Sequence, residues 1–120
     1  MVDEVRAQGA QVVVLLSHNG MDVDLKLASR VTGIDVILGG HTHDGMPMPS
    51  VIQNARGKTL VANSGSNSKF LSVMDLDVRD GKVADFRYRL LPIFANLLPA
   101  DPEMSAYIEG VREPFNSGSK

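Results

Sequence analysis

The sequence contains no cysteine, which excludes disulfide bonds, cysteine-ligated zinc sites and thiol catalysis. Aromatic residues make up only 5% of the chain and no basic stripe is present, so we expect no nucleic-acid binding. The longest purely apolar run, Val12 to Leu16, is far too short to cross a bilayer, and no membrane contact is expected. The first residues also lack the basic start and apolar core of a signal peptide.

The composition is that of one globular domain. A length of 120 residues ordinarily means a single domain, and a hydrophobic fraction of 43% is sufficient for a core. The formal net charge is −2, and no block of like charge stands out. We therefore expect a solvated, mildly acidic surface.

The first third of the chain predicts a strand–helix–strand unit. Residues 11–17 contain the continuous apolar run Val12–Leu16, which is typical of a strand buried on both faces, and residues 34–38 predict a second buried strand. Between them, residues 22–32 repeat apolar side chains at helical spacing, and Gly33 is a suitable stop. The repeating residues are Val23, Leu27 and Val31, with Ala28 beside them. This order implies a parallel strand pair and an α/β fold.

Short antiparallel strands are expected after Pro49. Val51–Ile52 and Thr59–Ala62 predict one pair, and Phe70–Val78 and Lys82–Leu91 predict a longer hairpin. A three-residue loop, 79–81, would keep the apolar faces of that hairpin together. Its pairing would place Met74 opposite Phe86 and Leu76 opposite Ala84.

A last helix is expected to begin at Asp101-Pro102, because Asp is a good N-cap and Pro suits the first helical position. Tyr107, Ile108 and Val111 would form its apolar side.

The three histidines of the sequence lie in two loops, each of which follows a predicted strand. His18 follows strand 11–17, and His41 and His43 follow strand 34–38. The carboxyl ends of parallel strands meet at one edge of a sheet, which is the usual ligand site of open α/β sheets. We therefore expect the three imidazoles to converge there. Because neutral imidazole binds zinc, manganese and iron-type ions, the pattern predicts a metal site.

Each polar residue near these loops also has a structural interpretation. Asn19 could contact a substrate, but capping of the following helix is the favoured role. Asp44 could orient a histidine through a hydrogen bond or simply stabilise the turn, and the sequence does not separate the two. Asp22 and Asp24 are expected to be acids of the first helical turn. The polar residues Asn63, Ser64, Gly65 and Asn67 lie in a loop that could reach the site, but a plain turn is the favoured interpretation.

The histidine loops resemble motifs of the calcineurin-like metallophosphoesterase superfamily, in its 5′-nucleotidase branch. The segments that carry this resemblance are Leu16–Gly20, Gly33–His41 and Gly40–His43. Within the branch, the sequence is most similar to the thiosulfohydrolases of bacterial sulfur oxidation. The segments that carry this closer similarity are Ser17–Asp24, Gly40–Gly45 and Phe86–Pro92. The resemblance extends to about Pro114.

The resemblance implies an enzyme with two divalent metal ions, which are manganese in the thiosulfohydrolases. His18 and His41 would bind one ion, and His43 would bind the other. Such enzymes hydrolyse a sulfonate group from a cysteine-bound sulfur intermediate on a carrier protein and release sulfate. The two ions polarise the sulfonate oxygens and activate water. The implied partner is a sulfur-carrier protein, and the implied compartment is the periplasm.

Several motifs of the family are missing from the sequence. These are an Asp-x-His pair, a bridging Asp, and an Asn-His-Glu segment with the acid–base histidine; the C-terminal substrate domain is missing too. We therefore expect an internal fragment, with a partial metallophosphoesterase domain over 1–114 and a frayed tail over 115–120. Its fold would be the α/β C-terminal portion of the family's β-sandwich, flanked by helices. Because three histidines cannot fill two coordination spheres, the isolated chain should be inactive or at most weakly metal-binding.

Three alternatives remain open. The parent protein could be a 5′-nucleotidase or another phosphomonoesterase of the same branch. It could instead be a metal-binding or interaction module without catalysis. Finally, the chain could be a gene fragment that does not fold stably alone and aggregates through exposed strand edges.

Overall fold

A four-stranded sheet forms the centre of the molecule, for which the computed structural model describes residues 1–116. Its strand order is β1-β2-β4-β3. The strands are β1 (Val14–Leu16), β2 (Val36–Gly39), β3 (Ser50–Asn54) and β4 (Gly57–Asn63). β1, β2 and β4 are parallel, and β3 runs antiparallel to β4 at the edge of the sheet.

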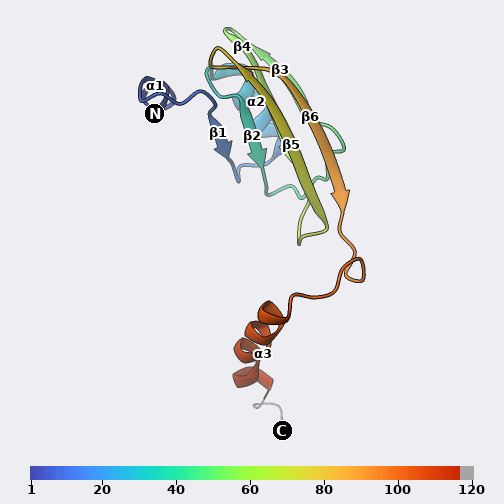
Figure 1. Ribbon diagram of the computed structural model, residues 1–120. Coiled ribbons are helices and arrows are strands. Elements are labelled where there is room, and N and C mark those ends of the chain that lie inside the picture. The colour runs from blue at the N-terminus through green and yellow to red at the C-terminus, as the bar shows by residue number, and fades with distance from the viewer. Residues whose placement is uncertain (117–120) are drawn as a thin grey trace.

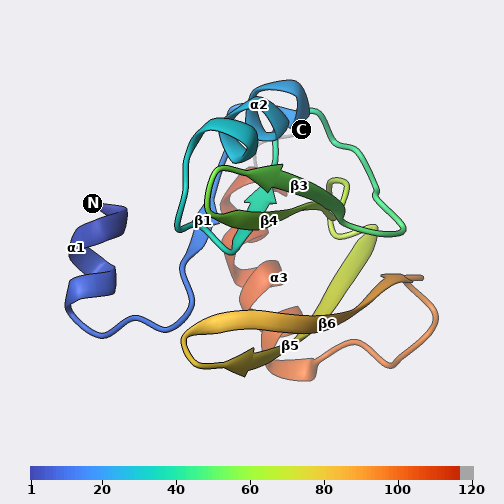
Figure 2. The same cartoon turned by 90° about the horizontal axis from the view of Figure 1, so that it is seen from above.

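Two further layers lie against this sheet. Helix α2 (Met21–Arg30) covers one face, and the long hairpin of β5 (Phe70–Arg79) and β6 (Lys82–Pro92) lies on the other side (Figure 2). The buried core forms between α2 and the sheet, where apolar side chains are shielded from water. Its members are Ala28, Ile34, Ile37 and Val61.

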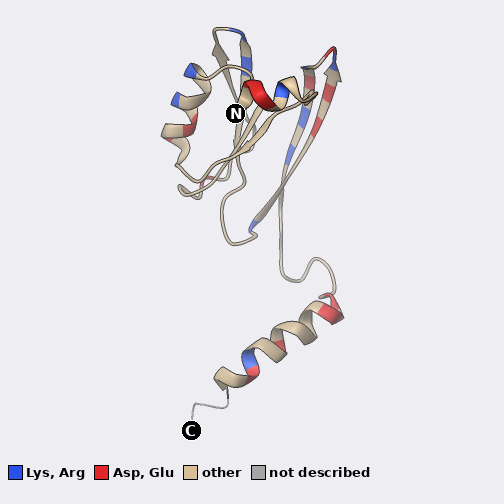
Figure 3. Ribbon diagram, turned by 90° about the vertical axis from the view of Figure 1, so that its left-hand side faces the viewer, with Lys and Arg blue, Asp and Glu red and all other residues tan. Residues whose placement is uncertain are grey.

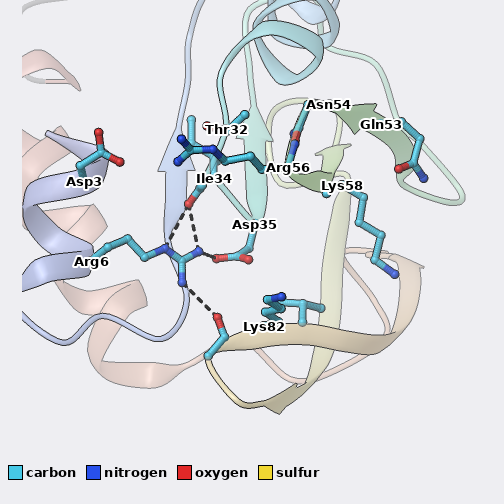
Figure 4. A pocket seen from close by; sticks show the side chains of 14 residues that line it. Asp3, Arg6, Thr32, Ile34, Asp35, Gln53, Asn54, Arg56, Lys58 and Lys82 are labelled. Carbon is cyan, nitrogen blue, oxygen red and sulfur yellow. Dashed lines mark hydrogen bonds and ion pairs between the residues drawn. The ribbon is translucent and has the colours of Figure 1, made fainter.

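Helix α1 (Val2–Ala7) contacts the rest of the molecule through Val2, which packs against the core, and through Arg6. Its guanidinium pairs with Asp35 and also donates to the carbonyls of Gly33 and Gly81 (Figure 4). A cavity of about 630 Å³ opens beside this cluster, where β2 begins and the turns of both hairpins lie. This is the end of the sheet opposite to the carboxyl ends of the parallel strands.

Helix α3 (Pro102–Asn116) stands apart from the layers (Figure 1). No residue of the helix is buried, and the radius of gyration is 18.7 Å. A compact chain of this length would have a radius of about 14 Å. The predicted cap is confirmed, because the amide of Met104 donates to the Asp101 carboxylate at 2.8 Å. α3 includes Phe115 and Asn116 of the predicted tail, and residues 117–120 lie outside the described part.

The strand–helix–strand unit is confirmed, but the expected burial of its first strand is wrong. β1 is shorter than residues 11–17, and Val14 and Leu16 are 48% and 77% exposed. The reason is that β1 is an edge strand: α2 contacts β2, β3 and β4 but not β1.

The inward face of α2 also differs from the predicted one. Ala28 is buried as expected, but Val23 is 46% exposed and Asp24 is fully buried. Asp24 and Ala28 are four residues apart and therefore lie on the same side of the helix. The view of Asp24 as an ordinary first-turn acid is thus incomplete.

The hairpin has a different register from the predicted one. Asp80 and Gly81, with φ of 51° and 71°, form a two-residue turn between Arg79 and Lys82. A bulge between Asp77 and Val78 then shifts the register by one residue, so that Met74 pairs with Tyr88 and Leu76 with Phe86. The bulge has the same effect as the predicted longer loop, since it keeps the apolar residues of both strands on one face.

Acidic and basic residues alternate along the hairpin and the helices, without a face of one sign in this view (Figure 3). Within residues 1–116, no helix is both long and apolar enough to cross a membrane.

Candidate metal centre

Three loops begin at the same edge of the sheet. Leu16 pairs with Leu38 and Gly39 pairs with Asn63, so the carboxyl ends of β1, β2 and β4 are level. The loop after β1 carries His18, and the loop after β2 carries the other two histidines (Figure 1). The predicted placement of both histidine loops at one edge is therefore confirmed.

The rings of His18 and His41 meet edge to face, with centroids 5.3 Å apart and an angle of 74° between their planes. The absence of a side chain at Gly40 leaves room for this approach, whereas Gly20 makes an ordinary van der Waals contact with the second ring. A Cβ atom on Gly40 would lie 3.1 Å from Nδ1 of His18, and one on Gly20 would lie 3.5 Å from Cδ2 of His41. A glycine of each loop thus lies next to the histidine of the other loop: Gly40 next to His18, and Gly20 next to His41.

The spacing of these two rings suits a shared metal ion. With a metal–nitrogen distance of about 2.1 Å and tetrahedral angles, two imidazole ligands have centroids about 5 Å apart. Both side chains are exposed, so an ion could reach them from solvent. His18 and His41 are thus two predicted ligands whose rings lie close together and open to solvent.

His43 is not part of this pair. Among residues 1–116, no three His, Asp or Glu side chains lie close enough to hold a metal ion together. The structure thus brings two of the three predicted ligands together, and the role of His43 stays a prediction.

The loop after β2 has an unusual backbone. His41 has a φ of 72°, and the amide of Thr42 donates to the carbonyl of Gly40 at 2.9 Å, as in a γ-turn. This turn is rare and strained when its central residue has positive φ. His43 also has positive φ, at 59°. Such strain persists only where surrounding contacts hold it, and it is common at binding sites.

The contacts that hold this loop come from the segment after β4, which the sequence had suggested was a plain turn. Asn63 is buried, and its side-chain amide donates to the Thr42 hydroxyl at 3.5 Å. The amide of Met46 donates to the Asn63 carbonyl at 2.9 Å, and the amide of Gly65 donates to the Asp44 carbonyl at 2.7 Å. The favoured interpretation as a plain turn is wrong for Asn63, and the alternative that this segment reaches the histidine loop is confirmed, because β4 lies next to β2.

The two polar residues considered beside the histidines, Asn19 and Asp44, have other contacts. Asn19 does not cap α2, whose N-cap is Gly20 without a side-chain bond. Its side chain instead donates to the Ser17 hydroxyl at 3.0 Å. The Asp44 side chain is exposed, and its residue supports the loop through its backbone carbonyl.

The sequence interpretation missed Asp24 at this site. Its carboxylate accepts a hydrogen bond from Ser17, the residue before His18, at 2.5 Å. The available signal was its helical spacing from Ala28, which places an acid on the apolar face.

The chain is similar to solved and curated hydrolases. It superposes on sulfate thiohydrolase SoxB of Thermus thermophilus, solved in complex with glycerol, with a TM-score of 0.87 and 42% identity over 97% of this chain. The 5′-nucleotidase precursor of Thermus thermophilus gives a TM-score of 0.85 and 27% identity over the same share. Bovine 5′-nucleotidase is 36% identical over 98% of this chain. No family model matches the chain.

The chain spans 21% of the SoxB chain, 26% of the Thermus nucleotidase and 23% of the bovine enzyme. Its mixed α/β fold matches the C-terminal portion of such 5′-nucleotidase and SoxB-type domains, as predicted.

Proposed function

Because these similarities support the 5′-nucleotidase-like metallophosphoesterase family, we propose that the chain is part of a metal-dependent hydrolase. The observation that carries the proposal is the edge-to-face pair of His18 and His41 at the carboxyl edge of the sheet. Parallel strands and close glycines place two imidazoles where an ion can join them.

In this proposal His18 and His41 bind one divalent ion and His43 binds a second, with manganese as the expected metal. When bound, such ions would polarise the oxygens of the substrate and activate water. The chain itself contributes imidazole nitrogens and a strained, well-supported loop that fixes them. The remaining ligands and the acid–base histidine would come from further residues of the same enzyme, so the 120 residues alone would be inactive.

Thiosulfohydrolysis is the first candidate reaction. The identity to SoxB, at 42%, exceeds the 27% shared with the 5′-nucleotidase of the same organism. The substrate would then be a sulfonate group on a cysteine-bound sulfur of a carrier protein. Water would break the bond between that sulfur and the sulfonate, so that the sulfonate leaves as sulfate and the sulfur stays on the cysteine. Nucleotide hydrolysis is the second candidate, and the 36% identity to bovine 5′-nucleotidase over nearly the whole chain favours it.

The test compares two substrates on the complete gene product that contains these residues, loaded with Mn²⁺. One substrate is a carrier peptide whose cysteine holds a terminal thiosulfonate group, and the other is adenosine monophosphate. Release of sulfate alone supports the first candidate, and release of phosphate alone supports the second. If neither product appears, or if His41→Ala leaves turnover unchanged, a non-catalytic binding module is the better explanation.

A periplasmic location belongs to the same proposal. The Thermus thermophilus relative is described as a precursor, which is consistent with export of such enzymes. Fractionation of cells that express the complete gene product would test it.

A further inference from the structure

Asp24 is a buried acid directly beneath the two histidine loops. It lies in the first turn of α2 and is 0% exposed, whereas Asp22 in the same turn is exposed. Both acids lie near the helix N-terminus, so the dipole of α2 does not by itself explain why one of them is buried.

The two carboxylate oxygens of Asp24 face different loops. Oδ1 accepts a hydrogen bond from the Ser17 hydroxyl at 2.5 Å. Oδ2 lies against Gly39, where a Cβ atom would be only 2.8 Å away. Ser17 precedes His18, and Gly39 begins the segment that leads to His41. The side chain of Asp24 therefore contacts both histidine-bearing segments, one at Ser17 and the other at Gly39.

The contacts of Asp24 are poor ones for stability. Oδ2 is buried and has no hydrogen-bond donor among the described residues. Burial of a charged group that is incompletely paired costs free energy, and an uncharged residue of similar size would avoid this cost. Buried groups of this kind need an explanation beyond packing, and functional sites commonly supply it.

We infer that Asp24 is a positioning residue for the metal site, a step that rests on the proposed function. It holds the Ser17 hydroxyl and the start of the Gly39–His41 segment in one arrangement, which fixes the relative orientation of the His18 and His41 rings. Its negative charge lies behind these rings and favours a cation on their solvent side. Groups that support metal ligands in this way are typically worth 10-fold to 100-fold in metal affinity.

The experiment uses Asp24→Asn in the complete gene product, with Asp22→Asn as the matched control. Asn keeps the shape of Asp24 but removes its charge, and the control removes the same charge from the exposed position of the same helical turn. Three properties are measured: the imidazole NMR resonances of His18 and His41 without metal, the affinity for Mn²⁺ alone, and Tm.

Asp24→Asn should shift both sets of resonances and weaken Mn²⁺ binding by about 10-fold to 100-fold. Its Tm should be unchanged or higher, whereas a merely structural role predicts a lower Tm with unchanged affinity per folded molecule. Asp22→Asn should change neither the resonances nor the affinity. The inference is overturned if Asp24→Asn behaves like Asp22→Asn.

Ser17→Ala provides a second variant that keeps the buried charge and removes the hydrogen bonds of the Ser17 hydroxyl, which are the bond to Asp24 and those from the amide and side chain of Asn19. It should shift the His18 resonances more than those of His41, and unchanged His18 resonances would count against the inference. This readout is independent of the proposed function. If the unmodified protein binds no Mn²⁺, the proposed metal site fails, while the metal-free resonances still decide whether Asp24 positions the rings.

Discussion

The hydroxyl of Tyr88 donates a hydrogen bond to the backbone carbonyl of Met46, 3.1 Å away and 42 residues earlier in the chain. The same hydroxyl lies 2.7 Å from Oγ of Ser72. Tyr88 is only 9% exposed, so these bonds are shielded from water. They connect the β5–β6 hairpin to the end of the loop that carries His41 and His43.

Tyr88→Phe should therefore lower the free energy of unfolding by about 1–2 kcal/mol, because it leaves the Met46 carbonyl without this donor. Chemical denaturation of the two proteins measures the difference. Tyr107→Phe is the matched control, since Tyr107 is 68% exposed and its change should stay within about 0.5 kcal/mol. Equal effects of the two substitutions would contradict the importance of the buried hydroxyl.

Gly40→Ala should weaken Mn²⁺ binding by about 10-fold while the protein stays folded. The new methyl group would lie 3.1 Å from Nδ1 of His18 and would displace that ring from His41. Calorimetric titration with Mn²⁺ and the far-ultraviolet circular dichroism spectrum separate loss of binding from loss of fold.

The control for this variant is Gly110→Ala in α3, where an added methyl group meets open space. Its Mn²⁺ affinity should equal that of the unmodified protein. A Gly40→Ala protein with the same affinity would show that the close approach of the two loops does not set the metal geometry.

Gly81→Ala should destabilise the protein by about 1 kcal/mol through backbone conformation alone. Gly81 has a φ of 71°, and nothing lies within 4 Å of a Cβ atom built there. Gly110 has equally open surroundings but helical backbone, so Gly110→Ala should raise the stability of α3 by up to about 1 kcal/mol. Opposite signs in thermal unfolding confirm the positive φ of Gly81, and equal signs argue against it.

Arg6→Ala should destabilise the protein by about 2–3 kcal/mol, because it leaves the Asp35 carboxylate without its cationic partner and several carbonyls without donors. Arg6→Lys should recover only part of the loss, since an ammonium cannot replace the guanidinium fork. Denaturant titration provides the measurement. Arg112→Ala, at an exposed ion pair with Glu109, should change stability by less than about 0.5 kcal/mol.

The β5–β6 hairpin shows what the alternation of apolar and polar residues can predict and what it cannot. The alternation of Met74 and Leu76 with polar residues correctly indicates which residues share a face, because the period of a strand is two residues. The exact partners were predicted incorrectly. A two-residue turn with a bulge and a three-residue loop satisfy the same alternation, and only the pairing of the folded strands distinguishes them.

The candidate site divides in a similar way. His18 and His41 were found from the sequence because each follows an apolar strand, and parallel strands end at one edge. A plain turn was the favoured interpretation for Asn63, because its contact with Thr42 depends on β4 lying beside β2. That neighbourhood joins segments about 20 residues apart, which local propensity does not specify.

The sequence by itself determined the helices, most of the strands and the two loops that carry the histidines, because these depend on periodicity, caps and turn residues within a few positions of one another. The tertiary structure decided that Asp24 is buried while Val14 and Leu16 are exposed. It also decided that His41 is near His18 but His43 is in no three-residue ligand group within residues 1–116. The burial of a side chain and the approach of two loops depend on which distant elements pack together. The free energy of this packing is shared among many contacts, so no short segment of the sequence determines it.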